Sequence, residues 1–128
     1  MSFSQAGAIL LYAGRISGLY PQCPIEAFKV DEALGGIDCL FQQFSRAKSH
    51  KYSFKFTNLM RYASGLDKLY AKNNLGPFLL GNNVSIADCK LEMLFRNLEF
   101  FDLPKSTLDR YAYLAAASKA VQTKLCQL

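Results

Sequence analysis

The sequence predicts an all-α protein, a right-handed helical bundle of about five to six helices without a sheet. Apolar residues recur three or four positions apart over long stretches, which is the spacing of one helix face. Strict apolar and polar alternation, which marks a half-buried strand, does not persist anywhere between turn signals. Of the 128 residues 51% are apolar, which is enough for one domain with a buried core.

The first two helices are predicted over residues 5–16 and 25–47. The first is apolar almost all round, which predicts burial, and the turn from Gly18 to Pro24 ends it. The second has apolar residues at every third or fourth position, namely Ala27, Val30, Leu34, Ile37, Phe41 and Phe44. Gly35 and Gly36 lie in its middle, where each costs about 1 kcal/mol relative to alanine. Such a pair either kinks a helix or lets another backbone approach closely.

Four more helices are predicted over residues 54–72, 86–101, 105–116 and 118–125. The first two of these again have one apolar face. Pro104 separates the second from the third, because proline cannot continue a helix that precedes it.

Residues 78–88, with the sequence F-L-L-G-N-N-V-S-I-A-D, carry the strongest local signal in the chain. Ser85 and Asp88 have the S-x-x-D spacing of a capping box, in which each side chain bonds the other residue's backbone N–H. Val84 and Cys89 are placed to form the hydrophobic staple beside it. Since backbone N–H groups occupy the Asp88 carboxylate, we expect a structural role for it.

Two motifs resemble cytosolic glutathione S-transferases of the alpha, mu, pi and sigma group. The run G-x-x-V-S-x-A-D at 81–88 is similar to the motif that starts the central helix of their all-helical C-terminal domain. Residues 5–20, Q-A-G-A-I-L-L-Y-A-G-R-I-S-G-L-Y, are similar to the last helix and linker of their thioredoxin-like domain. The resemblance therefore implies two parts, with residues 1–20 ending a truncated thioredoxin-like domain and residues 21–128 forming the C-terminal helical domain.

The resemblance also implies roles for three residues near the start of the chain. Gln5 matches a glutamine that contacts the γ-glutamyl end of glutathione. Ala6 matches a serine whose hydroxyl and backbone N–H hold a glutathione carboxylate, so that only the backbone donor is kept here. Arg15 matches an arginine of the dimer interface in pi-like members.

The activity implied by the resemblance is the conjugation of glutathione to electrophiles, with the helical domain supplying an apolar electrophile pocket. The residue that activates the glutathione thiol belongs to a part of the family fold that these residues do not match. We therefore expect no catalytic residue here, and the enzyme assignment stays open. The alternative is a non-catalytic docking module in a protein complex such as a translation-factor assembly. Glutathione is expected as a substrate, without a cofactor. The resemblance also implies that the first helix packs against the thioredoxin-like sheet in the family, so we expect its outer side to be uncovered here and the chain to form a homodimer or self-associate.

Other classes of protein are disfavoured by composition. The four cysteines Cys23, Cys39, Cys89 and Cys126 form no C-x-x-C pair and His50 is the only histidine, so we expect neither zinc nor disulfides. No apolar run is long enough for a transmembrane helix and no signal peptide is recognisable, so we expect a cytoplasmic protein without membrane contact.

The net charge of +5 is concentrated in one cluster, formed by Arg46, Lys48, Lys51, Lys55 and Arg61. Aromatic residues are interleaved with these cations, which is one pattern of nucleic-acid binding. A short basic cluster is nevertheless common on ordinary surfaces, so a solvated corner between two helices is the preferred interpretation. We therefore do not expect a nucleic-acid partner.

Overall fold

The computed structural model describes residues 5–50, 54–72 and 76–127 and shows an all-α fold. Its elements are α1 (Ala6–Ser17), α2 (Pro24–Ser49), α3 (Phe56–Ala71), α4 (Ile86–Arg96) and α5 (Ala112–Cys126), with short 3-10 helices η1 (Glu99–Phe101) and η2 (Lys105–Leu108) between α4 and α5. Within these ranges, β structure is limited to isolated bridges in the turn at 78–83. The predicted all-α class is confirmed.

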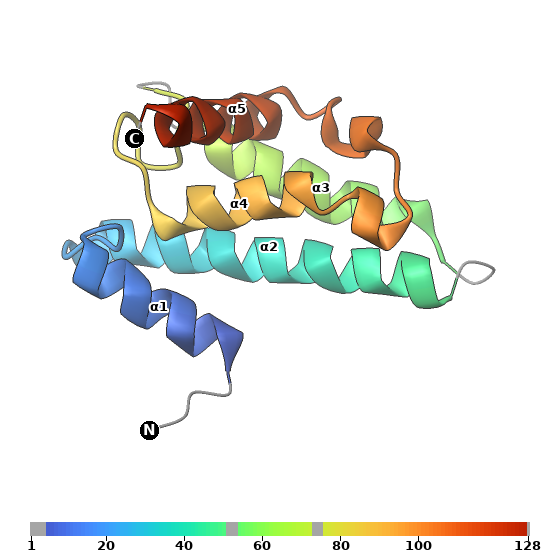
Figure 1. The fold of residues 1–128 in the computed structure, drawn as a ribbon, viewed down its shortest axis with the longest axis horizontal. Coiled ribbons are helices and arrows are strands. Elements are labelled where there is room, and N and C mark those ends of the chain that lie inside the picture. Colours follow the sequence, from blue (N-terminus) through green and yellow to red (C-terminus); the bar gives the residue numbers. More distant parts are fainter. Residues whose placement is uncertain (1–4, 51–53, 73–75, 128) are drawn as a thin grey trace.

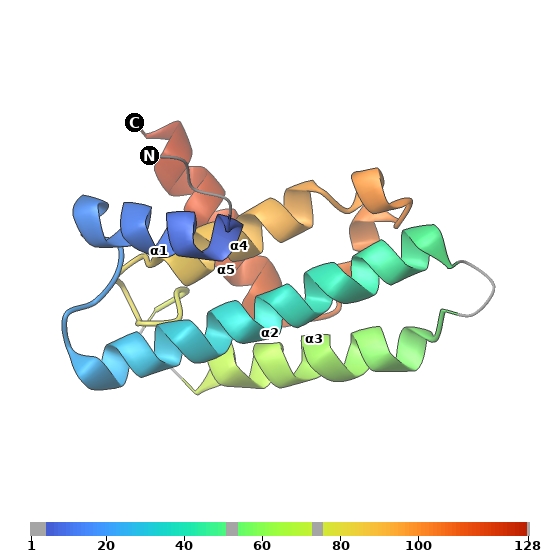
Figure 2. The same cartoon turned by 90° about the horizontal axis from the view of Figure 1, so that it is seen from below.

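Helices α2, α3, α4 and α5 build the core, and the long helix α2 runs along one side of the bundle for its whole length (Figure 1). Helix α2 packs on α3 and α4, and α5 closes the bundle against α3 and α4. Helix α1 lies beside this bundle and packs near the start of α4 (Figure 2). The core is one cluster of mainly aliphatic side chains, among which Ile37, Leu40, Phe44, Leu91, Leu94 and Leu114 are fully enclosed.

Helix α2 continues without a break through Gly35 and Gly36 (Figure 2). A Cβ atom at Gly36 would lie 3.2 Å from Leu66 Cδ1, so this glycine permits close packing of α2 on α3. A Cβ atom at Gly35 would meet nothing within 4 Å. Of the two predicted effects, close packing therefore applies at Gly36, against the Leu66 side chain, and α2 is one unbroken helix through both glycines.

The C-terminal part differs from the prediction. Helix α4 ends at Arg96, before the predicted limit at residue 101, and η1 follows. The predicted helices at 105–116 and 118–125 are wrong: η2 is short, and α5 is one helix that passes through Ser118. The cause is a cap from another element, because Asp67 of α3 accepts the backbone N–H groups of Tyr113 and Leu114, each at 3.1 Å.

The first helix is half-buried on one side, where Leu10 and Leu11 pack against the core, and its outer side is uncovered, as expected. Within α1 only Gly14 is buried, whereas Ile9, Tyr12 and Ile16 are 42%, 58% and 70% exposed. These three side chains lie three and four positions apart and so share one face. Helix α1 therefore presents an uncovered apolar face on the outside of the bundle. Separately, no helix among the described residues combines the length and the apolarity needed to cross a membrane.

Candidate functional site

The turn before α4 is organised by the buried carboxylate of Asp88, whose side chain has no exposed surface. Its Oδ1 accepts the Leu79 N–H at 3.1 Å, and its Oδ2 accepts the Ser85 N–H at 2.8 Å and the Ser85 hydroxyl at 3.1 Å. The Ser85 side chain in turn accepts the backbone N–H of Asp88. Ser85 and Asp88 thus form the reciprocal bonds of a capping box, and Asp88 also holds the preceding turn.

Burial of Asp88 raises the pKa of its carboxyl above the ordinary 3.8, although the hydrogen bonds from Ser85 and Leu79 oppose the rise. The phenol of Tyr70, which lies nearby on α3, has its pKa raised well above 10.0, first by burial and then by the charge of Asp88. The Tyr70 hydroxyl makes no hydrogen bond to any described residue. The interior beside the capping box is therefore a place where a negative charge is costly.

Helix α1 docks on this capped end of α4 through its own C-terminal end. The Ile86 N–H, the first of α4, donates to the Leu19 carbonyl at 3.0 Å. A Cβ atom at Gly14 would lie only 2.5 Å from Ile86 Cγ2, so the glycine allows the two helices to approach this closely. Gly18 ends α1 in the left-handed conformation, with φ of 77°, which suits a residue without a side chain.

Arg15 takes part in a cluster that joins α1, the linker and α2. Its guanidinium carbon lies 5.2 Å from the centre of the Tyr20 ring. The Tyr20 hydroxyl lies 3.1 and 3.0 Å from the two carboxylate oxygens of Asp31 on α2. Arg15 itself is exposed, so nothing within the chain prevents contact with a second molecule.

Gln5 and Ala6 lie at the opposite end of α1 from Arg15, and both are exposed. Gln5 is the N-cap residue with an extended backbone, and its side chain makes no capping bond. Its carbonyl accepts the Ile9 N–H at 3.1 Å, so the N–H groups of Ala6, Gly7 and Ala8 precede the first intrahelical bond. These groups and the helix dipole favour an anion at this end. The structure does not bring Gln5 and Ala6 next to Arg15 or the capping box.

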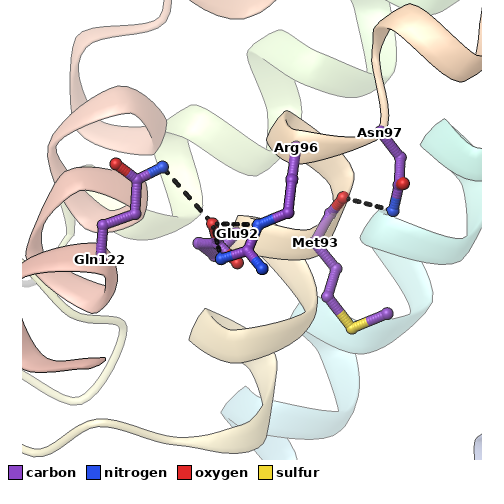
Figure 3. A network of polar contacts seen from close by, with 5 residues as sticks. All are labelled: Glu92, Met93, Arg96, Asn97 and Gln122. Atoms are coloured by element: carbon purple, nitrogen blue, oxygen red, sulfur yellow. Dashed lines mark hydrogen bonds and ion pairs between the residues drawn. The ribbon is translucent and has the colours of Figure 1, made fainter. Parts of the chain in front are cut away.

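A second buried carboxylate, Glu92, links α4 to α5 (Figure 3). Its Oε1 accepts hydrogen bonds from Nε and Nη2 of Arg96 at 3.1 and 2.8 Å. It also accepts one from Nε2 of Gln122 at 3.4 Å. The Glu92 side chain is 4% exposed and that of Arg96 is 63% exposed, so the cation also shields the acid from solvent. This cluster escaped the sequence analysis, although a Glu and an Arg four positions apart on a helix could have revealed the pair.

One of the cysteines, Cys89, and one member of the basic cluster, Lys48, lie in structural surroundings. Burial, followed by the charges of Asp88 and Glu92, raises the pKa of the Cys89 thiol, which disfavours the thiolate. Lys48 donates to the Phe100 carbonyl at 2.6 Å and lies 4.0 Å from the centre of its ring, so it fastens η1 to α2. Lys51 lies outside the described residues. Among the described residues, no group of His, Cys, Asp and Glu could hold a metal ion.

Comparison with known proteins agrees with this architecture. A family model described as the glutathione S-transferase C-terminal domain matches residues 36–124. The structure is similar to that of a pi-class glutathione S-transferase from Onchocerca volvulus, with a TM-score of 0.79 and 20% sequence identity. This match covers 99% of the present chain and 65% of the other chain, and at such identity it shows the fold alone. No curated protein matches the chain at a significant level.

Proposed function

Because the chain belongs to the glutathione S-transferase C-terminal domain family, we propose that it forms the helical, electrophile-binding part of a glutathione S-transferase-like protein. The family match over residues 36–124 carries this proposal. The position of α1 supports it, because this helix stands outside the bundle with its N-terminal end exposed. In the proposed role the chain contributes an apolar surface for the electrophile and one end of the glutathione site.

The glutathione contact is proposed at the start of α1. The N–H groups that follow Gln5 have no intrahelical acceptor and favour a carboxylate, and glutathione carries one at each end. Gln5 is exposed and its side chain makes no capping bond, so its amide can reach a ligand. Ala6 supplies a backbone donor and a methyl group, without the hydroxyl that a serine would add.

Calorimetric titration of glutathione into the 128-residue chain is expected to show weak binding without conjugation of a chlorodinitroarene electrophile. Gln5→Ala should weaken this binding about three- to tenfold, the effect of one lost hydrogen bond. Gln127→Ala, which alters an exposed amide at the far end of α5, is the matched control and should leave binding unchanged. No heat of binding, or equal binding by the Gln5 variant, would contradict the proposed contact.

A docking module is the second candidate function, and the side chain at Ala6 favours it. A methyl group at the first position of α1 cannot donate or accept a hydrogen bond, which weakens an anion site built on that helix end. Failure of the chain to bind glutathione would therefore support the docking function.

We also propose that the chain associates with itself through the apolar face of α1. The exposed side chains of Ile9, Tyr12 and Ile16 lie together on this face, and burying them between two copies removes apolar surface from water. Light scattering at increasing concentration should show dimers or larger species, and Ile16→Glu should return the chain to monomers. Met93→Glu, at an exposed methionine of α4, is the control and should still associate. A uniform monomer at high concentration would refute the proposal.

A further inference from the structure

The linker between α1 and α2 is held by a side-chain cluster that the capping motif and the proposed glutathione contact leave unexplained. The Tyr20 hydroxyl donates to the Asp31 carboxylate, with both oxygens within 3.1 Å. The Arg15 guanidinium lies over the ring of the same tyrosine. Tyr20 therefore joins the last turn of α1 to the third turn of α2 through one aromatic ring.

Helix α1 depends on attachments of this kind, because only its middle and its C-terminal end touch the rest of the molecule. Leu10 and Leu11 are half-buried against the core, whereas residues 5–9 are exposed. Gly14 is its single buried residue, and its hydrogen-bonded junction with α4 passes through Leu19, just beyond its end. The 12 residues of α1 span about 18 Å, so a tilt of about 10° at the docked end moves the free end by about 3 Å. The donor–acceptor distance of a hydrogen bond can vary by only a few tenths of an ångström. The angle of α1 therefore decides whether its first N–H groups can bond a ligand.

We propose that Tyr20 is a positioning residue, which fixes the angle of α1 on α2 through its hydrogen bond to Asp31. The consequence for ligand binding rests on the proposed function, since it assumes that the N-terminal end of α1 holds the tripeptide. The positioning itself does not depend on that assumption. Arg15 contributes by covering the ring, which keeps the hydroxyl directed toward α2.

The ionisation of Tyr20 agrees with this arrangement. Burial raises the pKa of the phenol above 10.0, and the hydrogen bond to Asp31 and its negative charge raise it further. Arg15 acts in the opposite direction, as a cation next to the ring should. Titration of this phenol therefore gives a direct readout of the bond, independent of the stability of the fold.

Hydrogen exchange of the 128-residue chain, measured on the variants Tyr20→Phe and Asp31→Asn, tests the proposal. Each variant should speed amide exchange in α1 about five- to tenfold and leave α2 to α5 unchanged, because one charge-assisted bond is lost. The double variant should add little to either single change, since both remove the same bond. Tyr62→Phe, at an exposed tyrosine of α3, is the control and should change neither helix.

Two further measurements separate this proposal from a general loss of stability and from the proposed function. In Asp31→Asn the Tyr20 pKa, followed by carbon NMR of the ring, should fall part of the way toward 10.0. Glutathione binding, where the wild-type chain binds it, should weaken in Tyr20→Phe. Unchanged α1 exchange in both variants would overturn the positioning role. Faster α1 exchange in a chain that does not bind glutathione would uphold it and reject the glutathione site.

Discussion

Replacing Asp88 with alanine is expected to lower the free energy of unfolding by about 3 kcal/mol, because several buried donors lose their acceptor together. The donors are the backbone N–H of Leu79 and both the N–H and the hydroxyl of Ser85. An unsatisfied buried donor costs about 1–3 kcal/mol, and some relief comes from removing a buried charge. Urea unfolding followed by far-ultraviolet circular dichroism measures the difference.

Two other variants make this result specific. Asp88→Asn keeps the shape but places an NH₂ group where one oxygen accepts, so it should cost less than alanine but still more than about 1 kcal/mol. Asp109→Ala removes an exposed aspartate and should stay within about 0.5 kcal/mol of the wild type. An Asp88→Ala chain as stable as Asp109→Ala would show that the capping box does not hold the turn.

The raised pKa of Asp88 gives the comparison with Asp88→Asn a pH dependence of defined sign. A carboxyl whose folded pKa lies above its ordinary 3.8 binds its proton more tightly in the folded state than in the unfolded state. The stability that comes from this tighter proton binding is complete below 3.8 and is lost as pH rises through the folded pKa, whereas the hydrogen bonds from Leu79 and Ser85 remain. The deficit of Asp88→Asn relative to the wild type should therefore be larger at acid pH than at neutral pH. Urea unfolding curves of both proteins at several pH values measure this difference in the free energy of unfolding. A deficit that grows from acid to neutral pH would contradict the prediction.

The start of α4 was readable from the sequence because its cap is local. Ser85 and Asp88 are three positions apart, so the spacing alone places both partners of the box. The start of α5 was not readable, because its first free N–H groups are bonded by Asp67, 46 and 47 residues earlier in the chain. A propensity pattern contains no record of such a partner, and the helix was consequently predicted to begin too early.

The candidate site, too, is predictable from the sequence only in part. The residue types at Gln5, Ala6 and Arg15 could be compared with a family pattern. Only the fold shows that Gln5 and Ala6 lie at one end of α1 and Arg15 at the other. The link from Tyr20 to Asp31 crosses a turn and joins residues 11 positions apart, so no helical spacing predicts it. The exposed face of α1 could be expected from the family resemblance, in which a sheet covers this helix. The apolar pattern alone indicates burial without showing what buries the helix.

The second large effect is expected at Gly14, where the docking of α1 depends on the absence of a side chain. Gly14→Ala would place its Cβ 2.5 Å from Cγ2 and 3.1 Å from Cδ1 of Ile86, a buried residue that is branched at Cβ and cannot turn away freely. Overpacking of this kind costs about 1–3 kcal/mol, against a helix-propensity gain of about 1 kcal/mol. We expect α1 to lose its contact with α4. Amide exchange in α1 should then be faster, and glutathione binding weaker, than in the wild-type chain.

Gly7→Ala is the matched control, since it makes the same change in the same helix at a position with nothing within 4 Å of the added carbon. It should stabilise α1 by up to about 1 kcal/mol and slow its exchange, because alanine favours the helix. The two variants should thus change the amide exchange rate of α1 in opposite directions, faster in Gly14→Ala and slower in Gly7→Ala. If both slow its exchange, the contact between Gly14 and Ile86 does not limit the docking of α1.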